Sequence, residues 1–195
     1  MVNMKEFIDL AFLSGTEGRA DCQWGWQVYA GTFAEKITSN KGLSILDVGA
    51  GLGLSRNRLQ GPSGVNKVTL QDVAPNLPVD ITTPIEEIPD NSYDMVTAFD
   101  VIEHIVKDTH FLAQLNRVSK EFVIVTTPNY NISKNGNPYH VREYTPSSLI
   151  NLVLPYEVLI YISGDGSGNS IKKYLTLDEF IKHNDAHHGF ILRKD

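Results

Sequence analysis

The sequence predicts an α/β protein in which helices cover both faces of a mostly parallel sheet. Two observations predict this class. Short apolar segments of strand length alternate along the chain with segments of helical periodicity, and the first buried strand runs directly into a glycine-rich turn at 49–53. We therefore expect a three-layer sandwich with a seven-stranded sheet whose last strand is antiparallel to the one before it.

The expected strands are apolar runs bounded by turn residues. They are 43–48, 67–71, a short strand ending near Asp80, 93–99, 122–126, 157–163 and 189–193. Residues 73–90 hold four of the nine prolines, so no regular helix is expected there.

The expected helices are 3–13, 26–39, a short one ending near Leu59, 101–118, 145–153 and one after Thr176. The helix over 101–118 has apolar residues at helical spacing. Thr145-Pro146 supplies a cap and a proline at the first helical position. Thr176 with Glu179 forms a capping box. No linker divides the chain, so we expect one domain over 1–195, with a helical cap over 1–40 and a core over 41–195.

Composition excludes several classes of function. With a net charge of −6, the chain lacks the excess of basic residues expected of a protein that binds long nucleic acid through its phosphates. Cys22 is the one cysteine, so neither an internal disulfide nor a cysteine-rich metal site is expected. No apolar run approaches the roughly 20 residues of a membrane span, and acids at Glu6 and Asp9 favour an amphipathic helix over a signal peptide. We expect a cytoplasmic monomer or homodimer without a membrane partner.

The glycine-rich turn is the most informative segment. A nicotinamide enzyme would need a glycine at Leu54 to complete G-x-G-x-x-G, which disfavours that hypothesis. The segment instead reads D-x-G-x-G-x-G at Asp47, Gly49, Gly51 and Gly53. In this it resembles the class I S-adenosylmethionine-dependent methyltransferases, whose fold is a Rossmann-like sandwich.

The resemblance implies S-adenosyl-L-methionine as the cofactor. The glycine backbone would lie against its methionine and ribose, and Asp47 near its amino group. Asp72, which ends the second strand, would accept the ribose hydroxyls, and Asp80 would accept from the adenine amino group. The cofactor-binding residues expected on this basis are Asp47, Gly49, Gly51, Gly53, Asp72, Val73, Asp80, Phe99 and Asp100.

Two later segments extend the resemblance to about residues 43–155. Residues 99–105 resemble a D-V-x-E-H segment, and Thr127-Pro128-Asn129 precedes a segment from His140 to Leu149 that a subgroup of the family shares. The loops at the carboxyl ends of strands bind ligands in such sheets, so His140, His104 and Glu103 are the candidate catalytic residues. A histidine titrates near neutral pH, which makes His140 the preferred base; a purely structural loop hydrogen bond is the alternative.

A metal-assisted reaction is a second hypothesis, although our main hypothesis includes no metal. Asp100, Glu103 and His104 share one helical face and, with His140, form a set suited to a divalent cation. The arrangement is similar to the metal site of small-RNA 3′-terminal 2′-O-methyltransferases, in which a glutamate stands at the position of Asp100.

The remaining aromatic and histidine groups have less specific interpretations. For Trp24, Trp26, Tyr29 and Phe33 we favour helix packing over a lid on the acceptor pocket. The group His183, His187 and His188 is interpreted as a solvated turn, and 164–168 as a flexible loop.

The function expected overall is methyl transfer to an oxygen or nitrogen of a small-molecule, sugar or nucleotide acceptor. The alternatives are a metal-assisted enzyme that methylates an RNA end and a non-catalytic cofactor-binding protein. The acceptor itself cannot be identified from loops whose sequences vary with chemistry.

Overall fold

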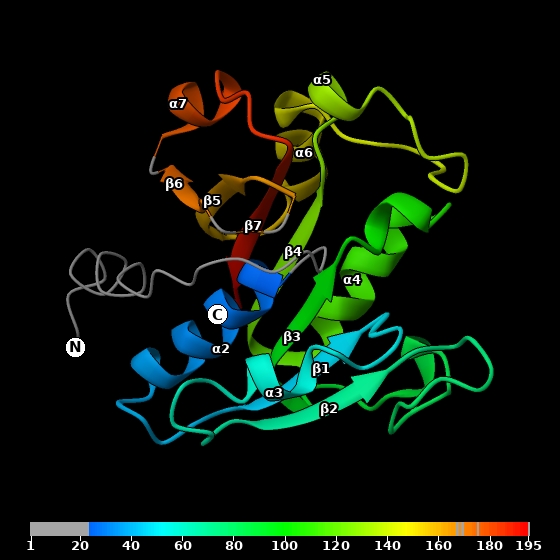
Figure 1. Ribbon diagram of the computed structural model, residues 1–195, viewed down its shortest axis with the longest axis vertical. Coiled ribbons are helices and arrows are strands. Elements are labelled where there is room, and N and C mark those ends of the chain that lie inside the picture. Colours follow the sequence, from blue (N-terminus) through cyan, green and yellow to red (C-terminus); the bar gives the residue numbers. More distant parts are fainter. Residues whose placement is uncertain (1–23, 167, 169, 175, 195) are drawn as a thin grey trace.

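The structure is a computed structural model that describes residues 24–166, 168, 170–174 and 176–194 (Figure 1). The expected helix over 3–13 and Cys22 lie outside the described residues, as does most of the expected cap over 1–40. Within the described residues, no helix is long and apolar enough to cross a membrane.

One sheet of seven strands forms the centre of the fold, in the order β2-β1-β3-β4-β7-β5-β6. The strands β2, β1, β3 and β4 are parallel, β7 is antiparallel to both β4 and β5, and β6 is antiparallel to β5. The strands are β1 Ser44–Val48, β2 Lys67–Gln71, β3 Tyr93–Phe99, β4 Ser119–Pro128, β5 Val158–Gly164, β6 Lys172–Tyr174 and β7 His187–Arg193.

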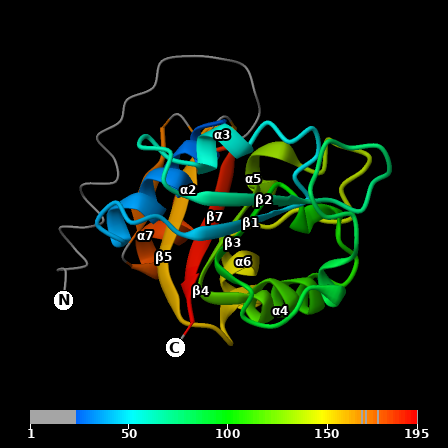
Figure 2. The same ribbon diagram turned by 90° about the horizontal axis from the view of Figure 1, so that it is seen from below.

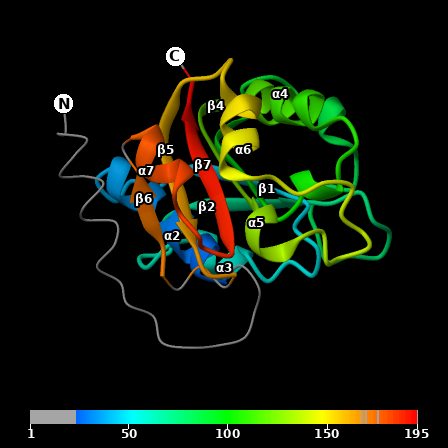
Figure 3. The ribbon, with the colours of Figure 1, turned by 90° about the horizontal axis from the view of Figure 1, so that it is seen from above.

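Helices cover both faces of this sheet, as Figures 2 and 3 show from opposite sides. The α-helices are α2 Trp24–Ile37, α3 Arg56–Leu59, α4 Asp108–Val118, α5 Tyr130–Ser133, α6 Pro146–Val153 and α7 Leu177–Ile181; two short 3-10 helices are η1 Ile85–Glu87 and η2 Ile102–His104. Alternate residues of the strands point to opposite faces. Ile45 therefore packs with α2 and α3, whereas Leu46 packs with α4 and α6.

The expected α/β sandwich is confirmed, with differences in three segments. No strand forms before Asp80; residue 81 makes only an isolated bridge to Gln71, because three prolines between 75 and 84 interrupt the chain. The seventh strand is β6 instead. The helix expected over 101–118 is broken into η2 and α4, and the loop over 127–144 contains the short helix α5.

The capping predictions are confirmed. The hydroxyl of Thr145 accepts from the backbone N–H of Ser148 at 3.2 Å, with Pro146 at the first helical position. The hydroxyl of Thr176 accepts from the N–H of Glu179 and donates to its carboxylate.

Three aromatic residues of α2, Trp26, Tyr29 and Phe33, are buried and pack against the sheet, as preferred from the sequence; the side chain of Trp24 lies outside the described part of the structure. The interpretation of the late histidines as a solvated turn is wrong. His183 and His188 are buried, and Nε2 of His183 lies 3.2 Å from Nδ1 of His188. They are buried because α7 and the start of β7 fold back onto β5.

Candidate active site

Three cavities lie at the edge of the sheet where the parallel strands end. The first, called the Asp72 cavity, has a volume of about 510 Å³ and reaches from Gly49 and Asp72 to His110. The second, the Gly51 cavity, has about 230 Å³ and lies between the glycine turn and α2. The third, the His140 cavity, has about 480 Å³ and lies under the loop that follows α5.

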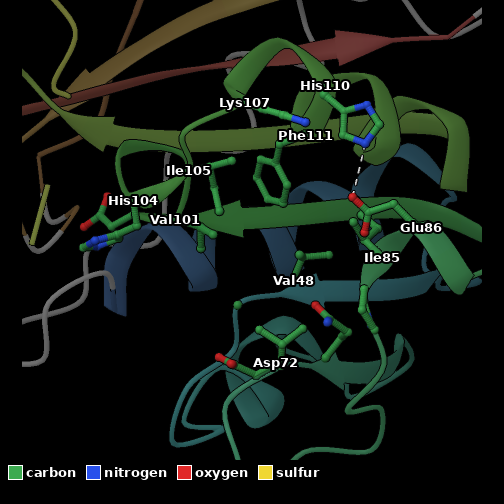
Figure 4. A pocket seen from close by; sticks show the side chains of 15 residues that line it. Val48, Asp72, Ile85, Glu86, Val101, His104, Ile105, Lys107, His110 and Phe111 are labelled. Atoms are coloured by element: carbon green, nitrogen blue, oxygen red, sulfur yellow. Dashed lines mark hydrogen bonds and ion pairs between the residues drawn. The ribbon is translucent and has the colours of Figure 1, made fainter. Parts of the chain in front are cut away.

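The Asp72 cavity is a slot with apolar walls and a few polar groups at its ends (Figure 4). Its apolar walls are formed by Val48, Val73, Pro84, Ile85, Val101, Ile105 and Phe111. Asp72 lies at one end, and Glu86 lies at the other with its carboxylate 3.2 Å from Nε2 of His110. Such a slot suits a flat, mostly apolar ring system with polar edges.

The glycine turn separates the Asp72 cavity from the Gly51 cavity, since Gly49 lines both. Gly49 has a φ of +71°, and a Cβ there would lie 2.5 Å from Cγ2 of Val101, so no larger residue fits. Gly51 also has a positive φ, yet a Cβ there would meet nothing within 4 Å. Its bare backbone faces open cavity rather than protein.

Asp72 fixes the turn to the end of β2. Its Oδ2 accepts from the backbone N–H of Gly51 at 3.0 Å, and its Oδ1 accepts from that of Ala74 at 2.9 Å. The partly exposed carboxylate lines the Asp72 cavity beside Val73. Each oxygen keeps a further lone pair for a ligand hydroxyl.

Three residues expected beside the cofactor do not line these cavities. The carboxylate of Asp47 accepts from the Thr97 hydroxyl at 2.7 Å, and burial raises the pKa of Asp47 to about 6. Phe99 packs into the core against α2. Gly53 turns the chain at a φ of +71°, and a Cβ there would press on Leu70 and Pro78. These three residues support the glycine turn without lining a cavity.

Asp80 also lies away from the three cavities. Its Oδ2 accepts from the backbone N–H of Leu70 at 2.8 Å and from Arg56 at 2.7 Å. Its pKa is lowered, chiefly because of the Leu70 hydrogen bond. Since β2 is an edge strand and no strand forms outside it, Asp80 caps an N–H that a further strand would have paired.

The His140 cavity shares two residues, Asp100 and His104, with the Asp72 cavity. Asp100 has a φ of +53°, and its backbone N–H donates to Thr126 of β4. The two cavities therefore adjoin along the segment that follows β3. A group bound in one can reach a group bound in the other across Asp100 and His104.

Glu103 lies at the buried side of the His140 cavity. Its Oε2 accepts from the Thr127 hydroxyl at 3.1 Å, whereas its buried Oε1 has no hydrogen-bond partner among the described residues. Burial, followed by the charge of Asp100, raises the pKa of Glu103 to about 8. This carboxyl group therefore keeps its proton to a higher pH than an exposed glutamate does.

The two candidate histidines face each other in this cavity, with ring centroids 4.8 Å apart. Nδ1 of His104 lies 3.0 Å from the carbonyl of Tyr139, and Nδ1 of His140 lies 2.6 Å from the carboxylate of Glu143. If each Nδ1 carries the proton, each Nε2 is left as an acceptor.

The carboxylate of Glu143 is held in turn. Burial opposes its charge, yet hydrogen bonds from Ser133, His140 and the backbone of Asn135 keep the pKa of Glu143 below its ordinary value. Glu143 is thus an ionised partner that orients His140. The loop stays close to η2 because the N–H groups of residues 141 and 142 both donate to the carbonyl of Glu103.

The structure brings together His140, His104, Glu103 and Asp100 as the sequence predicts, and adds residues that sequence reasoning missed. Glu143 stands three residues after His140, a spacing that could have indicated a pair. Glu86 and His110 lie 24 residues apart, and His187 comes from the last strand to line the His140 cavity. No sequence signal connects these three to the site.

The comparisons with known proteins concern the domain and the fold. Residues 46–124 match the model of a family described as a methyltransferase domain. No curated protein matches the sequence.

Solved structures share the fold at low identity. A possible histamine N-methyltransferase from Thermotoga maritima has a TM-score of 0.60 and 13% identity, covering 100% of this chain and 96% of that one. Magnesium protoporphyrin IX methyltransferase from Synechocystis PCC 6803, with bound SAH, has a TM-score of 0.58 and 13% identity, covering 98% and 94%. The small RNA methyltransferase HEN1 has a TM-score of 0.62 and 18% identity, covering 92% of this chain and 27% of that one.

Residues 46–124 match a methyltransferase domain, and the chain has the fold of methyltransferases that depend on S-adenosylmethionine.

Proposed function

We propose that the chain methylates an oxygen or nitrogen of a small-molecule, sugar or nucleotide acceptor bound in the His140 cavity. The observation that carries this proposal is the shared wall of the two large cavities. Asp100 and His104 line both, so a cofactor in the Asp72 cavity and an acceptor in the His140 cavity would meet there.

The residues around the glycine turn fit S-adenosylmethionine. The open space in front of Gly51 admits a ligand against the backbone, which supports assigning the methionine part to the Gly51 cavity. Asp72 and Val73 suit the ribose, and the apolar slot suits the adenine. These assignments leave Asp47, Gly53 and Phe99 as supports of the turn.

We assign recognition of the adenine edge to Glu86 rather than Asp80. The carboxylate of Asp80 already accepts hydrogen bonds from Leu70 and Arg56. Glu86, in contrast, lines the slot at the end opposite Asp72. A carboxylate at that end can accept from an exocyclic amino group. His110 would hold Glu86 in place.

The cofactor supplies an activated methyl group, so the chain's main task is to hold the acceptor in line with it. Orientation of this kind can lower a barrier by ~7–11 kcal/mol. An acceptor hydroxyl or amine must also lose a proton. His140 is the base we favour, because Glu143 orients its Nδ1. Its Nε2, which lies 3.0 Å from the side-chain amide nitrogen of Asn137, would take the proton once an acceptor displaces that amide.

Glu103 complements His140 through its protonated carboxyl. A neutral carboxyl group can donate a hydrogen bond to an acceptor oxygen or nitrogen. Its Oε1 has no partner among the described residues, which leaves it available to a ligand. His104, which lines both the Asp72 and the His140 cavities, would form part of the wall between them.

The experiment that tests this function has two stages. Calorimetry of the purified chain with S-adenosylmethionine, S-adenosylhomocysteine and NAD should show binding of the first two and not the third. Transfer of a radiolabelled methyl group to a panel of hydroxyl and amine acceptors should then identify the acceptor. Binding of NAD alone contradicts the proposal, and binding without transfer to any class of acceptor favours a non-catalytic protein.

A metal-assisted reaction is the second candidate, and one observation favours it. Ligand atoms of Glu103, His104 and His140 all lie within 4.8 Å of one another. Both histidines place Nδ1 on a carbonyl or carboxylate, as metal-binding histidines commonly do, and a cation at Nε2 of His140 would displace the Asn137 amide that lies 3.0 Å from it. A divalent cation held by these three residues would polarise an acceptor hydroxyl and ease its loss of a proton.

Titration with Mn²⁺ and Co²⁺ separates the two candidates. The metal-assisted enzyme would bind the ion and lose transfer activity on chelation, with recovery on adding metal back. Full activity after exhaustive chelation would leave His140 as the base. Only the metal-assisted candidate draws on the likeness to the small RNA methyltransferase.

A further inference from the structure

His187 lines the His140 cavity but has no part in the mechanism above. It is the first residue of β7 and pairs with Pro128 of β4 on one side and Gly164 of β5 on the other. This position brings its ring to the edge of the sheet where β4 ends. The nearby Gly166 leaves room for the ring, since a Cβ there would lie 3.2 Å from Cε1 of His187.

The imidazole holds one oxygen of Asp100. Nε2 of His187 lies 3.2 Å from Oδ2 of Asp100, and the Thr126 hydroxyl lies 3.3 Å from Oδ1. Both side chains are largely buried, with 17% and 13% of their surface exposed for His187 and Asp100. The backbone of Asp100 is in the left-handed region, which a residue with a Cβ adopts only when its surroundings hold it there. The carboxylate is thus held at both oxygens on a strained backbone.

The position of Asp100 relates it to the sulfur of the cofactor. Gly49 lines both the Asp72 and the Gly51 cavities, so the sulfur that joins the nucleoside to the methionine would lie close to Gly49. Val101 contacts Gly49, and the adjacent Asp100 lines the Asp72 and His140 cavities. Asp100 therefore lies on the wall between the cavity assigned to the nucleoside and the cavity assigned to the acceptor, along the path of the methyl group.

We propose that His187 is a positioning residue that, together with Thr126, aims the Asp100 carboxylate at the sulfonium, so that the site prefers the cationic donor to its neutral demethylated product. The inference rests on the proposed function, in that it takes the cofactor to span the Asp72 and Gly51 cavities. A carboxylate attracts a sulfonium but not a thioether, and the attraction is stronger in a partly buried site than in water. A site built in this way would release its product readily.

The test is calorimetry of S-adenosylmethionine and S-adenosylhomocysteine with the wild type and three variants. The wild type should bind the donor at least fivefold more tightly than the product. His187→Leu should reduce that ratio at least fivefold, mainly by weakening the donor. His187→Gln, whose amide can still donate to Asp100, should keep the ratio within twofold. Thr126→Val, nearly isosteric, should lower the ratio in the same direction and serves if His187→Leu does not fold.

Three outcomes would overturn the inference. The first is a wild type that binds donor and product equally. The second is a His187→Leu protein that keeps the full preference. The third is an equal loss of both affinities, with a lower melting temperature, in both His187 variants, which would mark a structural role. A wild type with no affinity for either ligand would instead overturn the proposed function.

Discussion

The glycine turn and the loop that carries His140 form the two sides of one site, and they are built in different ways. The turn is formed by residues close together in sequence, and positive φ angles at Gly49, Gly51 and Gly53 give it its shape. The other side collects side chains from the segments after β3, β4 and β5 and from β7. Hydrogen bonds such as those from His140 to Glu143 and from Thr127 to Glu103 hold it together.

The difference teaches what each side can control. The glycine turn would bind the cofactor, which is the same for every acceptor, through its backbone. It tolerates few substitutions, because a Cβ would fill the space that the ligand needs. A set of side chains on loops can be altered one at a time and can therefore suit different acceptors. Substitutions in the turn should change cofactor affinity, whereas substitutions around His140 should change the rate of transfer.

The largest effect is expected at His140. His140→Ala should lower kcat by about 10²–10⁴-fold, because the positioned base is lost, while the affinity for S-adenosylhomocysteine stays within about twofold. Glu143→Gln should lower kcat less, since the histidine remains but is less firmly oriented. Steady-state kinetics with the acceptor found in the panel, alongside calorimetry, measure both quantities. A cofactor affinity that falls as steeply as kcat would contradict the division between the two sides.

The next prediction compares two glycines whose backbone has a positive φ. Gly51 and Gly64 both have a positive φ and open space where a Cβ would lie, but of the two only Gly51 lines one of the three cavities described above. Gly51→Ala should weaken S-adenosylhomocysteine at least about tenfold, or ~1.4 kcal/mol. Gly64→Ala is the matched control and should leave the affinity unchanged.

Both alanine variants should lose a similar ~1–2 kcal/mol of stability, because the strain of the left-handed region is the same. Chemical denaturation measures this loss. Equal affinities for the two variants would show that no ligand approaches the backbone at Gly51.

A smaller effect separates Glu86 from Asp80. Glu86→Gln should weaken S-adenosylhomocysteine by about 0.5–1.5 kcal/mol, the range of one hydrogen bond. Asp80→Asn should leave the affinity within about twofold and lower the melting temperature instead, because it weakens the cap on Leu70 of the edge strand. Calorimetry and thermal unfolding of the two variants would contradict the assignment if the effects were exchanged.

The last prediction concerns the stability of the chain and the buried histidines His183 and His188. Burial lowers the pKa of His183, and burial together with the neighbouring His183 and His187 lowers the pKa of His188 further. The unfolded chain takes up these protons near pH 6.5, whereas the folded chain resists. Their contribution to stability is therefore full above pH 6.5 and is lost as the pH falls below it.

The variant His188→Gln removes the contribution of His188 to the pH dependence of stability. Between pH 7 and pH 5 the wild type should lose more stability than the variant, by up to ~1.4 kcal/mol for each pH unit. Buried acids with raised pKa values, Asp47 and Glu103, act in the opposite direction but are present in both proteins. Urea unfolding at several pH values measures the difference, and parallel pH profiles would show that His188 takes up its proton equally in the folded and the unfolded chain.

The fold could be predicted because its signals are local. The strands β2 and β3 have the limits predicted from their apolar runs, and Thr145 and Thr176 cap their helices as expected. The strand expected before Asp80 does not form, and β6 could not be foreseen because its three residues, Lys172–Tyr174, have no apolar pattern and depend on pairing with β5.

The site could be predicted in part for the same reason. Gly49, Gly51, Asp72, Val73 and Asp100 line the cavities, since a strand followed by a turn fixes where such residues point. Asp80 was expected in the site because the resemblance assigns an acid after the third strand to the adenine, but the backbone of the unpaired edge strand competes for it. His187 was missed because its contact with Asp100 spans 87 positions and exists only once β7 lies beside β4.

A crystal structure of the chain with S-adenosylhomocysteine tests the central claim most directly. The account predicts the adenine in the slot between Ile85 and Val101, the ribose at Asp72, and the sulfur between Gly49 and Asp100, with the His140 cavity left open for the acceptor. A nucleoside lying in the His140 cavity, or bound away from the glycine turn, would contradict it.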